Sequence, residues 1–179
     1  MARTLIPLAQ GCEELEAVTL IDLLRRAGIE VVTAGLMEGP VVASRGVTLI
    51  PDTSLAEVLD QSFDMIILPG GLPGADYLDR DPRIHELLER SNYVAAICAA
   101  PKVLARSGLL KGRRATSYPG VLDGMNLPQV EVDLKSAVIR DGNVITSRGP
   151  GTAMDFALEL IEVLVGREKR DEVEAGLMR

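Results

Sequence analysis

The sequence has little cysteine and histidine, the residues from which disulfide frameworks and zinc sites are built. It contains two cysteines and one histidine among 179 residues. Two cysteines cannot form a disulfide framework, and with a single histidine they leave no plausible zinc site at these spacings. Any cysteine chemistry must therefore be that of a free thiol, and we expect no metal or other cofactor.

The sequence also lacks a hydrophobic run long enough to cross a membrane. The longest stretches without Asp, Glu, Lys or Arg are residues 65–75 and 91–101, of 11 residues each. A membrane helix needs about 18 to 20 such residues. The first residues show neither the long apolar region nor the cleavage site of a secretory signal. We therefore expect a cytoplasmic protein with no membrane partner.

Charge narrows the class of partner further. Asp and Glu number 26 against 19 Lys and Arg, so the formal net charge is −7. A phosphate polymer is repelled at long range by such a chain. Nucleic acid is therefore disfavoured as a stable partner.

Segments that predict strands and helices alternate along the chain. Short runs rich in Val and Ile predict buried strands, and apolar residues at helical spacing predict helices between them. The predicted strands are residues 4–9, 29–34, 65–68, 93–97, 114–117, 136–140 and 143–147, with a small hairpin at 41–43 and 47–50. The predicted helices are residues 14–27, 81–90, 101–107, 150–165 and 168–177, with a short helix opened by a capping box at 54–57. Residues 69–74 are too rich in Gly and Pro to be either. The pattern predicts one α/β domain over residues 1–179, a three-layer sandwich around a mostly parallel sheet.

Cys98 is the first candidate for a reactive group. It directly follows a predicted buried strand, at the carboxyl edge where reactive groups of α/β sheets gather. Ala96 and Ala100 are small, as the sharp turn of a nucleophile elbow requires, although the strict pattern has Gly there. The start of the following helix is expected to favour the thiolate and lower its pKa. An inert core cysteine is the alternative, which position alone leaves open.

Two glycines and three glutamates are expected at the same edge. Gly70 and Gly71 follow a strand and could aim backbone amides at an oxyanion, although a Pro-Gly-Gly sequence is usually only a turn. Glu13, Glu14 and Glu16 open a helix, where carboxylates normally compensate the macrodipole. Glu16 lies just beyond the apolar stripe, where partial burial would keep it protonated near neutral pH. Glu13 would also point inward if the helix began that early.

Cys12 and His85 are predicted to lie outside the reactive site. Like charge from three neighbouring glutamates should raise the pKa of Cys12 if it is exposed. His85 falls on the solvent face of its predicted helix. Without it, neither a Cys-His nor a Ser-His-Asp hydrolase can be built from this chain.

Five segments in matching order resemble the ThiJ/PfpI superfamily and cover nearly the whole chain. Within it they are similar to the branch of the parkinsonism-associated protein deglycase (DJ-one) and its bacterial YajL-type relatives. The five segments are Gly11–Glu16, Arg25–Ile29, Leu68–Gly71, Ala95–Pro101 and Thr146–Thr152. The stretch Val165–Lys169 also looks like that of the bacterial relatives.

The resemblance implies a fold and a site. The fold is a flavodoxin-like sandwich similar to class I glutamine amidotransferases, and the assembly is a homodimer. The site has a reactive Cys98 that oxidises readily to sulfinate and a protonated Glu16 hydrogen-bonded to its sulfur. The amides of Gly70 and Gly71 lie nearby. The resemblance also implies pocket or dimer-interface positions for Ala99, Arg26, Arg45, Tyr118, Arg148 and Pro150.

Two departures from the family pattern bear on activity. Tyr118 stands where the human-type branch has a histidine near the cysteine, and a phenol with a pKa of about 10 cannot act as a base near neutral pH. Ala99 stands where the protease-like branch has a histidine, which disfavours peptidase activity. The resemblance implies a stress-response enzyme acting on a small aldehyde or dicarbonyl, or on glycated adducts, of glyoxalase or deglycase type. A redox sensor with chaperone-like function is the alternative, and both use the same thiol and carboxyl.

Overall fold

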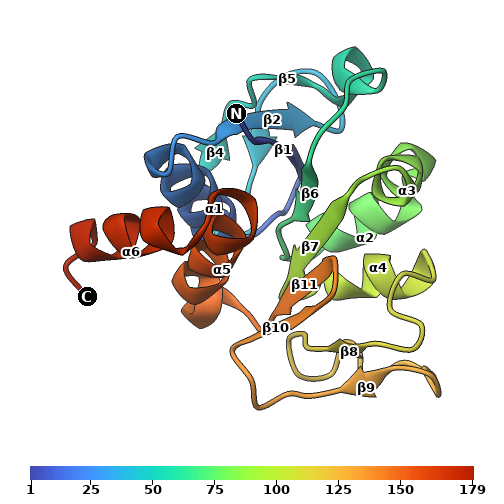
Figure 1. Ribbon diagram of the computed structural model, residues 1–179. Coiled ribbons are helices and arrows are strands. Elements are labelled where there is room, and N and C mark those ends of the chain that lie inside the picture. The colour runs from blue at the N-terminus through green and yellow to red at the C-terminus, as the bar shows by residue number, and fades with distance from the viewer.

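The computed structural model describes residues 1–179 and is organised around a seven-stranded sheet (Figure 1). The strand order is β10-β11-β7-β6-β1-β2-β5. These strands are β1 (Arg3–Leu8), β2 (Glu30–Gly35), β5 (Thr53–Ser54), β6 (Met65–Leu68), β7 (Tyr93–Ile97), β10 (Val138–Asp141) and β11 (Val144–Ser147). Every neighbouring pair is parallel except the β10–β11 hairpin. The predicted mostly parallel sheet is confirmed.

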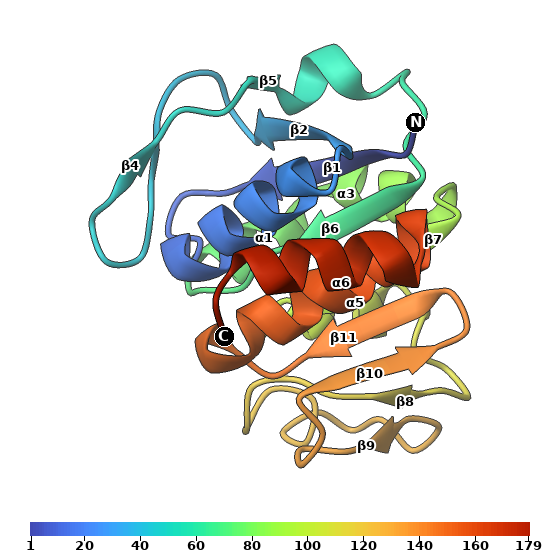
Figure 2. The same cartoon turned by 60° about the vertical axis from the view of Figure 1, so that its left-hand side comes forward.

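Two small sheets lie outside this one. β3 (Val41–Val42) and β4 (Thr48–Leu49) form the predicted antiparallel hairpin, which projects from the body in Figure 2. β8 (Arg114–Ala115) pairs in parallel with β9 (Glu131–Val132), a strand that the sequence pattern does not predict.

Helices cover both faces of the main sheet. One layer holds α1 (Glu14–Arg26), α5 (Ala153–Val165) and α6 (Arg167–Gly176), which lie in front of the sheet in Figure 2. The other layer holds α2 (Gly74–Arg80), α3 (Pro82–Glu89) and α4 (Pro101–Arg106). Two short 3₁₀ helices, η1 (Leu55–Val58) and η2 (Pro150–Thr152), complete the chain. No helix is both long enough and apolar enough to cross a membrane.

Two hydrophobic cores, one on each face of the sheet, hold the three layers together. Successive side chains of a strand point to opposite faces of the sheet, so neighbouring residues pack in different cores. Leu5 and Ile66 pack in the core beneath α2, α3 and α4, whereas Ile6 and Ile67 pack in the core beneath α1 and α5. This alternation explains why strands that are apolar throughout suit the centre of a three-layer sandwich.

Besides β9, the elements differ from the predicted ones at α2 and at η1. Residues 69–73 form the expected loop, but the chain then enters α2, whose seven residues are too few to show a clear helical period. Position 74, the first of this helix, holds a glycine because a Cβ there would lie 2.7 Å from the backbone nitrogen of Cys12. The helix predicted from residue 54 is the 3₁₀ helix η1, and its capping box is wrong because Ser54 forms no side-chain cap. Ser54 instead belongs to β5, at the edge of the main sheet.

Candidate active site

The turn after β7 places Cys98 at the carboxyl edge of the sheet. Its φ is 63°, in the left-handed region that non-glycine residues rarely adopt. The turn is fixed on both sides, since the Cys98 amide donates to the Ser147 carbonyl (3.0 Å) and the Cys98 carbonyl accepts from the Tyr118 amide (2.9 Å). Ala96 and Ala100, the two small neighbours, are fully buried. The nucleophile-elbow geometry expected from the sequence is confirmed.

Glu16 reaches this turn from the first turn of α1. Its side chain is completely buried, and Oε2 accepts a hydrogen bond of 2.8 Å from the Gly70 amide. The carboxyl also shares a side-chain hydrogen bond with Cys98. Burial raises the pKa of Glu16 to about 7, against the opposing effect of the two hydrogen bonds. The expectation of a carboxyl that holds its proton near neutrality is therefore supported.

The other two glutamates of α1 have structural roles. Glu13 is the N-cap residue, and its side chain accepts from the Leu15 amide. Glu14 binds the β3–β4 hairpin through the Ser44 hydroxyl (3.0 Å) and the Arg45 amide (2.8 Å). Burial acts to raise the pKa of Glu14, but hydrogen bonds from these donors outweigh it and lower the pKa. Glu16 alone of the three faces Cys98, a choice that helical periodicity left open.

The sulfur of Cys98 has donors and an acid around it. The backbone amides of Gly71 and Ala99 donate hydrogen bonds that lower its pKa, but burial and an ionised Glu16 raise the pKa to about 12. The expectation of a lowered thiol pKa from the following helix is therefore wrong. Burial is the main reason and the negative charge of Glu16 is the second, and α4, with only six residues, does not offset them.

Gly70 and Gly71 are glycines because the site leaves no room for side chains. A Cβ on Gly70 would lie 2.6 Å from the Cys98 Cβ and 2.8 Å from Oε2 of Glu16. A Cβ on Gly71, whose φ is 89°, would lie 2.4 Å from the Glu13 nitrogen. The Gly70 amide donates a hydrogen bond to the Glu16 carboxyl, and the Gly71 amide donates one to the Cys98 sulfur.

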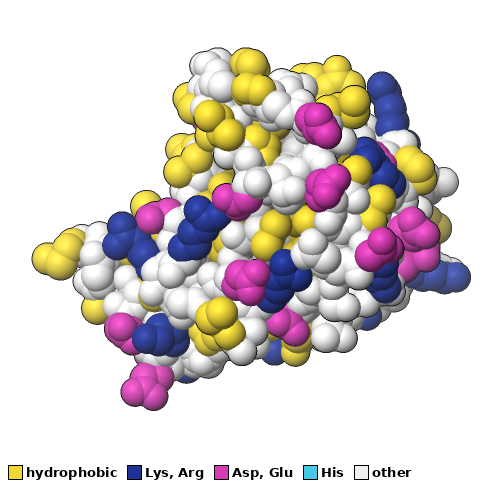
Figure 3. Space-filling model, turned by 90° about the horizontal axis from the view of Figure 1, so that it is seen from above, with side chains coloured by type: hydrophobic (Ala, Val, Ile, Leu, Met, Phe, Trp, Pro, Cys, Tyr) yellow, Lys and Arg dark blue, Asp and Glu magenta, His cyan; other side chains and the backbone are white.

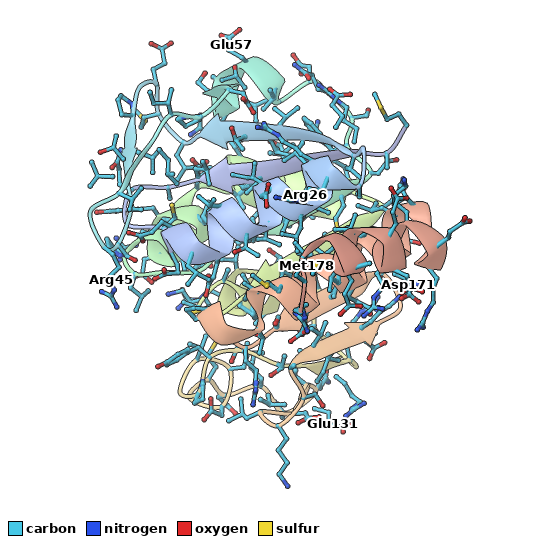
Figure 4. All side chains as sticks on the ribbon, turned by 90° about the vertical axis from the view of Figure 1, so that its left-hand side faces the viewer. Arg26, Arg45, Glu57, Glu131, Asp171 and Met178 are labelled. Carbon is cyan, nitrogen blue, oxygen red and sulfur yellow. The ribbon has the colours of Figure 1, made fainter.

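The three candidate arginines lie in different places. Arg26 is in the last turn of α1, ten residues and about 15 Å along the helix axis from Glu16, and it pairs with Asp22 (2.9 Å). This places Arg26 away from Cys98, and its alternative position at a dimer interface stays a prediction. Arg45 lies on the tip of the projecting hairpin, far from Arg26 in Figure 4. Arg148 follows β11 and donates to the Leu134 carbonyl (3.2 Å), while its buried Nε has no partner.

Tyr118 and the segment at Pro150 border the Cys98 turn. The Tyr118 amide binds the Cys98 carbonyl, whereas its side chain is 52% exposed and its hydroxyl makes no hydrogen bond within the protein. A Cβ built on Gly149 would lie 3.3 Å from the Tyr118 ring, so the residue before Pro150 touches the tyrosine. Pro150 then opens η2. These neighbours form one rim beside the cysteine.

Cys12 and His85 lie outside the site. Cys12 is fully buried, and burial, followed by the charge of Glu14, raises its pKa to about 11. His85 is held between Ser107 Oγ (2.6 Å to Nδ1) and the Asp79 carbonyl (2.7 Å to Nε2), so it is a structural link and not a free surface residue. No group of three His, Cys, Asp or Glu side chains is placed to hold a metal ion.

Comparisons with known proteins match nearly the whole of this chain. The sequence model of the DJ-1/PfpI family matches residues 2–163. Protein dj-1beta of Drosophila melanogaster is 47% identical, covering 97% of this chain and 95% of its own. The glutathione-independent glyoxalase DJR-1.2 of Caenorhabditis elegans is 39% identical, covering 92% of this chain and 89% of its own.

Solved structures extend the agreement to the fold. The crystal structure of Drosophila melanogaster DJ-1beta gives a TM-score of 0.94 at 44% identity, covering 99% of this chain and 97% of its own. The oxidized DJ-1 of Toxoplasma gondii gives 0.93 at 37% identity, covering 99% and 98%. Sequence and fold agree from one end of the molecule to the other, and on that ground the chain belongs to the DJ-1/PfpI family.

Proposed function

We propose that this chain is a cofactor-free, cysteine-dependent enzyme that acts on reactive dicarbonyls or their adducts, as a glutathione-independent glyoxalase or a protein deglycase. The observation that carries the proposal is the buried Glu16 carboxyl against the strained Cys98 turn. A nucleophile and a proton carrier in direct contact are the two groups that this chemistry requires. A relative of 39% identity is named for glyoxalase activity, which supports the same reaction class. We place this activity in the cytoplasm.

The resting pair carries one proton and one negative charge above the first ionisation. Charge on either group raises the pKa of the other, so Cys98 and Glu16 titrate as a pair. The order of the two pKa values, about 7 for Glu16 and about 12 for Cys98, puts the charge on the carboxyl, whereas three features of the geometry favour the charge on sulfur and the proton on the carboxyl. Glu16 is fully buried whereas Cys98 is partly exposed, two amides face the sulfur against one on the carboxyl, and Oε1 of Glu16 accepts no hydrogen bond from the protein. With its proton, Glu16 no longer repels the thiolate and donates a hydrogen bond to it.

The proposed reaction begins when the Cys98 thiolate attacks the aldehyde carbon of methylglyoxal. A C–S bond forms, and the carbonyl oxygen takes a proton from Glu16 to give a hemithioacetal. The Glu16 carboxylate then removes the proton from the sulfur-bearing carbon and gives it to the oxygen of the neighbouring carbonyl, which forms an enediol. It next takes the hydroxyl proton from the sulfur-bearing carbon and returns a proton to the neighbouring carbon. The product is a lactoyl thioester on Cys98. Water hydrolyses it, which releases lactate and restores the thiol, so the sequence needs no oxidant or cofactor.

Because Tyr118 stands in place of a histidine, we expect a low turnover rate. His85 is the single histidine of the chain, and it binds Ser107 and Asp79 elsewhere in the fold, so no histidine lies near Cys98. Glu16 or water must therefore carry every proton, and turnover should be slow. The partly exposed Tyr118 ring would serve as a wall for the substrate instead of as a base.

Lactate formation from methylglyoxal tests the proposal. We expect the Cys98→Ser variant to be inactive, and undiminished lactate formation by it would overturn the proposal. In deuterated water, lactate should carry deuterium at its second carbon, since the proton on Glu16 exchanges with solvent during the transfer. Lactate without this deuterium would indicate direct hydride migration and would remove Glu16 from the mechanism.

A redox role of the same residue is the second candidate. The partly exposed sulfur beside a protonated carboxyl suits oxidation to sulfinate, since Glu16 would donate a hydrogen bond to the new oxygen. Mild peroxide should then add about 32 Da to Cys98, the mass of two oxygens, and leave the buried Cys12 unchanged. Oxidation at Cys12 instead would contradict a sensing or chaperone role based on Cys98.

We propose in addition that the protein is a homodimer. Leu15 and Val18 are exposed one turn apart on α1, and the adjoining β3–β4 hairpin exposes Val47 and Ile50. Figure 3 shows hydrophobic atoms gathered on the lobe that projects from the body. Exposed apolar side chains on adjoining elements favour association. Sedimentation velocity should give a dimer for the wild type and a monomer for Leu15→Asp/Val18→Asp, with unchanged circular dichroism, and a monomeric wild type would refute the dimer.

A further inference from the structure

A cavity lies at the carboxyl edge of the sheet, away from Cys98. It has a volume of about 570 Å³ and opens beyond the ends of β1 and β2. Its lining residues are Leu8, Gln10, Leu36, Met37, Val41, Tyr77, Arg80, Asp81, Pro82 and Arg83. None of them belongs to the Cys98 site. β6 separates β1 from β7, so two strand spacings, about 10 Å, divide the strands that end at the two sites.

The cavity is lined by apolar side chains and by an Asp81–Arg83 ion pair whose charges cancel. Leu8 and Val41 are buried side chains that line it. Asp81 accepts from the Arg83 side chain on both carboxylate oxygens and from the Arg83 amide, and Arg83 also donates to the Leu36 carbonyl (3.0 Å). This network joins the start of α3 to the residue after β2, and it pairs the charges of Asp81 and Arg83 with each other. Asp81 also occupies the N-terminus of α3, which excludes a phosphate from that place.

One positive charge at the cavity has no partner. Arg80 lies three residues after Tyr77 on α2, so the two side chains share a face of the helix. The Arg80 guanidinium makes no ion pair, and the Tyr77 hydroxyl makes no hydrogen bond within the protein. Arg80, Arg83 and Asp81 together give the cavity a net charge of +1 in a chain of net charge −7.

The combination of these features selects the ligand. We infer that this cavity is a binding site for an organic monocarboxylate with an aromatic or branched apolar body, whose carboxylate pairs with Arg80. Apolar pockets with one or two placed polar groups are the usual form of small-molecule sites, and the guanidinium fork matches a carboxylate. Tyr77 (43% exposed) and Met37 (76% exposed) stand at the mouth, where an aromatic ring and a flexible thioether can close over the apolar body. A single unpaired cation suits one negative charge and not two.

Amide chemical shifts of the isotope-labelled protein, titrated with 3-phenylpropionate, test this site. We expect shifts around Leu36, Tyr77 and Arg80, and weaker binding of the uncharged 3-phenylpropionamide. Arg80→Gln should weaken carboxylate binding about fivefold, the effect of an ion pair at an accessible site, and should leave amide binding unchanged. Lys111→Gln, which removes an exposed and unpaired positive charge elsewhere, is the matched control and should have no effect. Met37→Trp should fill the mouth and weaken both compounds.

Three results would overturn the inference. The first is equal binding of the carboxylate and the amide to the wild type. The second is an Arg80→Gln effect no larger than that of Lys111→Gln. The third is a set of shifts centred on Gly71 and Cys98, which would place the ligand in the other site. Binding by Cys98→Ser should equal that of the wild type, so the result does not depend on the proposed enzyme activity.

Discussion

The turns after β1 and β7 each place a cysteine near glutamates at the carboxyl edge of the same sheet, yet only one is suited to chemistry. Cys12 is fully buried in the core, and burial raises the pKa of both thiols. Cys98 is partly exposed, has a left-handed backbone conformation and faces the amides of Gly71 and Ala99. The difference lies in the backbone. A strained turn lifts Cys98 out of the core and toward donors, whereas Cys12 remains a packing residue.

The largest expected effect separates these two cysteines directly. Cys98→Ala removes the nucleophile and should lower lactate formation from methylglyoxal by at least about 10³-fold, as loss of a catalytic nucleophile does. Cys12→Ala removes only a buried sulfur and should change the rate by less than about twofold. Steady-state assays of the two variants measure both effects. A comparable loss in both would show that the two turns do not differ in function.

Glu16 should make the stability of the fold depend on pH in a way that no other glutamate of α1 does. Its pKa rises from an unfolded value of 4.5 to about 7 in the folded protein. Because the folded state holds the proton more tightly, this contribution to stability is complete below the unfolded pKa and is lost as pH rises through the folded pKa. The loss between the two values is at most about 3 kcal/mol.

Glu16→Gln removes this titration and keeps an oxygen for the Gly70 amide. Denaturant unfolding across this pH range should show stability falling in the wild type and staying nearly level in the variant. Glu14→Gln is the control, and since the pKa of Glu14 is lowered, it should leave the decline in place. A wild-type stability that is flat over this range would contradict a buried carboxyl with a raised pKa.

Gly70 tests whether close packing holds the pair together. An alanine methyl would lie 2.6 Å from the Cys98 Cβ and 2.8 Å from Oε2 of Glu16, so Gly70→Ala should cost about 1 to 3 kcal/mol of stability. Displacing the pair should also lower activity by about 10²-fold. Gly176→Ala, with no atom in the way, should lose neither. Thermal unfolding and lactate assays measure the two effects, and a fully active Gly70→Ala enzyme would show that the spacing is not critical.

Tyr118 should have the smallest effect. Its amide fixes the Cys98 carbonyl, which any residue can do, while its hydroxyl makes no hydrogen bond within the protein. Tyr118→Phe should therefore change kcat by less than about threefold, the range of a minor surface contact. A loss of tenfold or more would assign the phenol a part in proton transfer and would change the proposed mechanism.

Much of the fold could be predicted because its signals are local. Runs of Val and Ile predict residues 65–68 and 93–97 with the bounds that the structure has, and Asp81 before Pro82 predicts the start of α3. α2 could not be predicted in this way, since its one exposed face and seven residues give little periodicity. The edge strand β5 and the strand β9 have two residues each, and only tertiary pairing reveals them.

The site could be predicted in part. Its strand-edge position singles out Cys98, and family resemblance singles out Glu16, but helical periodicity alone could not choose among three glutamates. The sign of the pKa change at Cys98 depends on the charge of a residue 82 positions away in sequence, which no local pattern contains. The cavity at Arg80 escapes the sequence for a similar reason, since its walls come from separate strands and helices.

The location of the charge within the pair is the central claim, and spectroscopy of the resting protein measures it directly. At neutral pH we expect ultraviolet absorbance of a thiolate that is lost in Cys98→Ser, together with the infrared band of a protonated carboxylic acid that is lost in Glu16→Gln. A neutral thiol beside an ionised carboxylate, with neither signal present, would contradict the account.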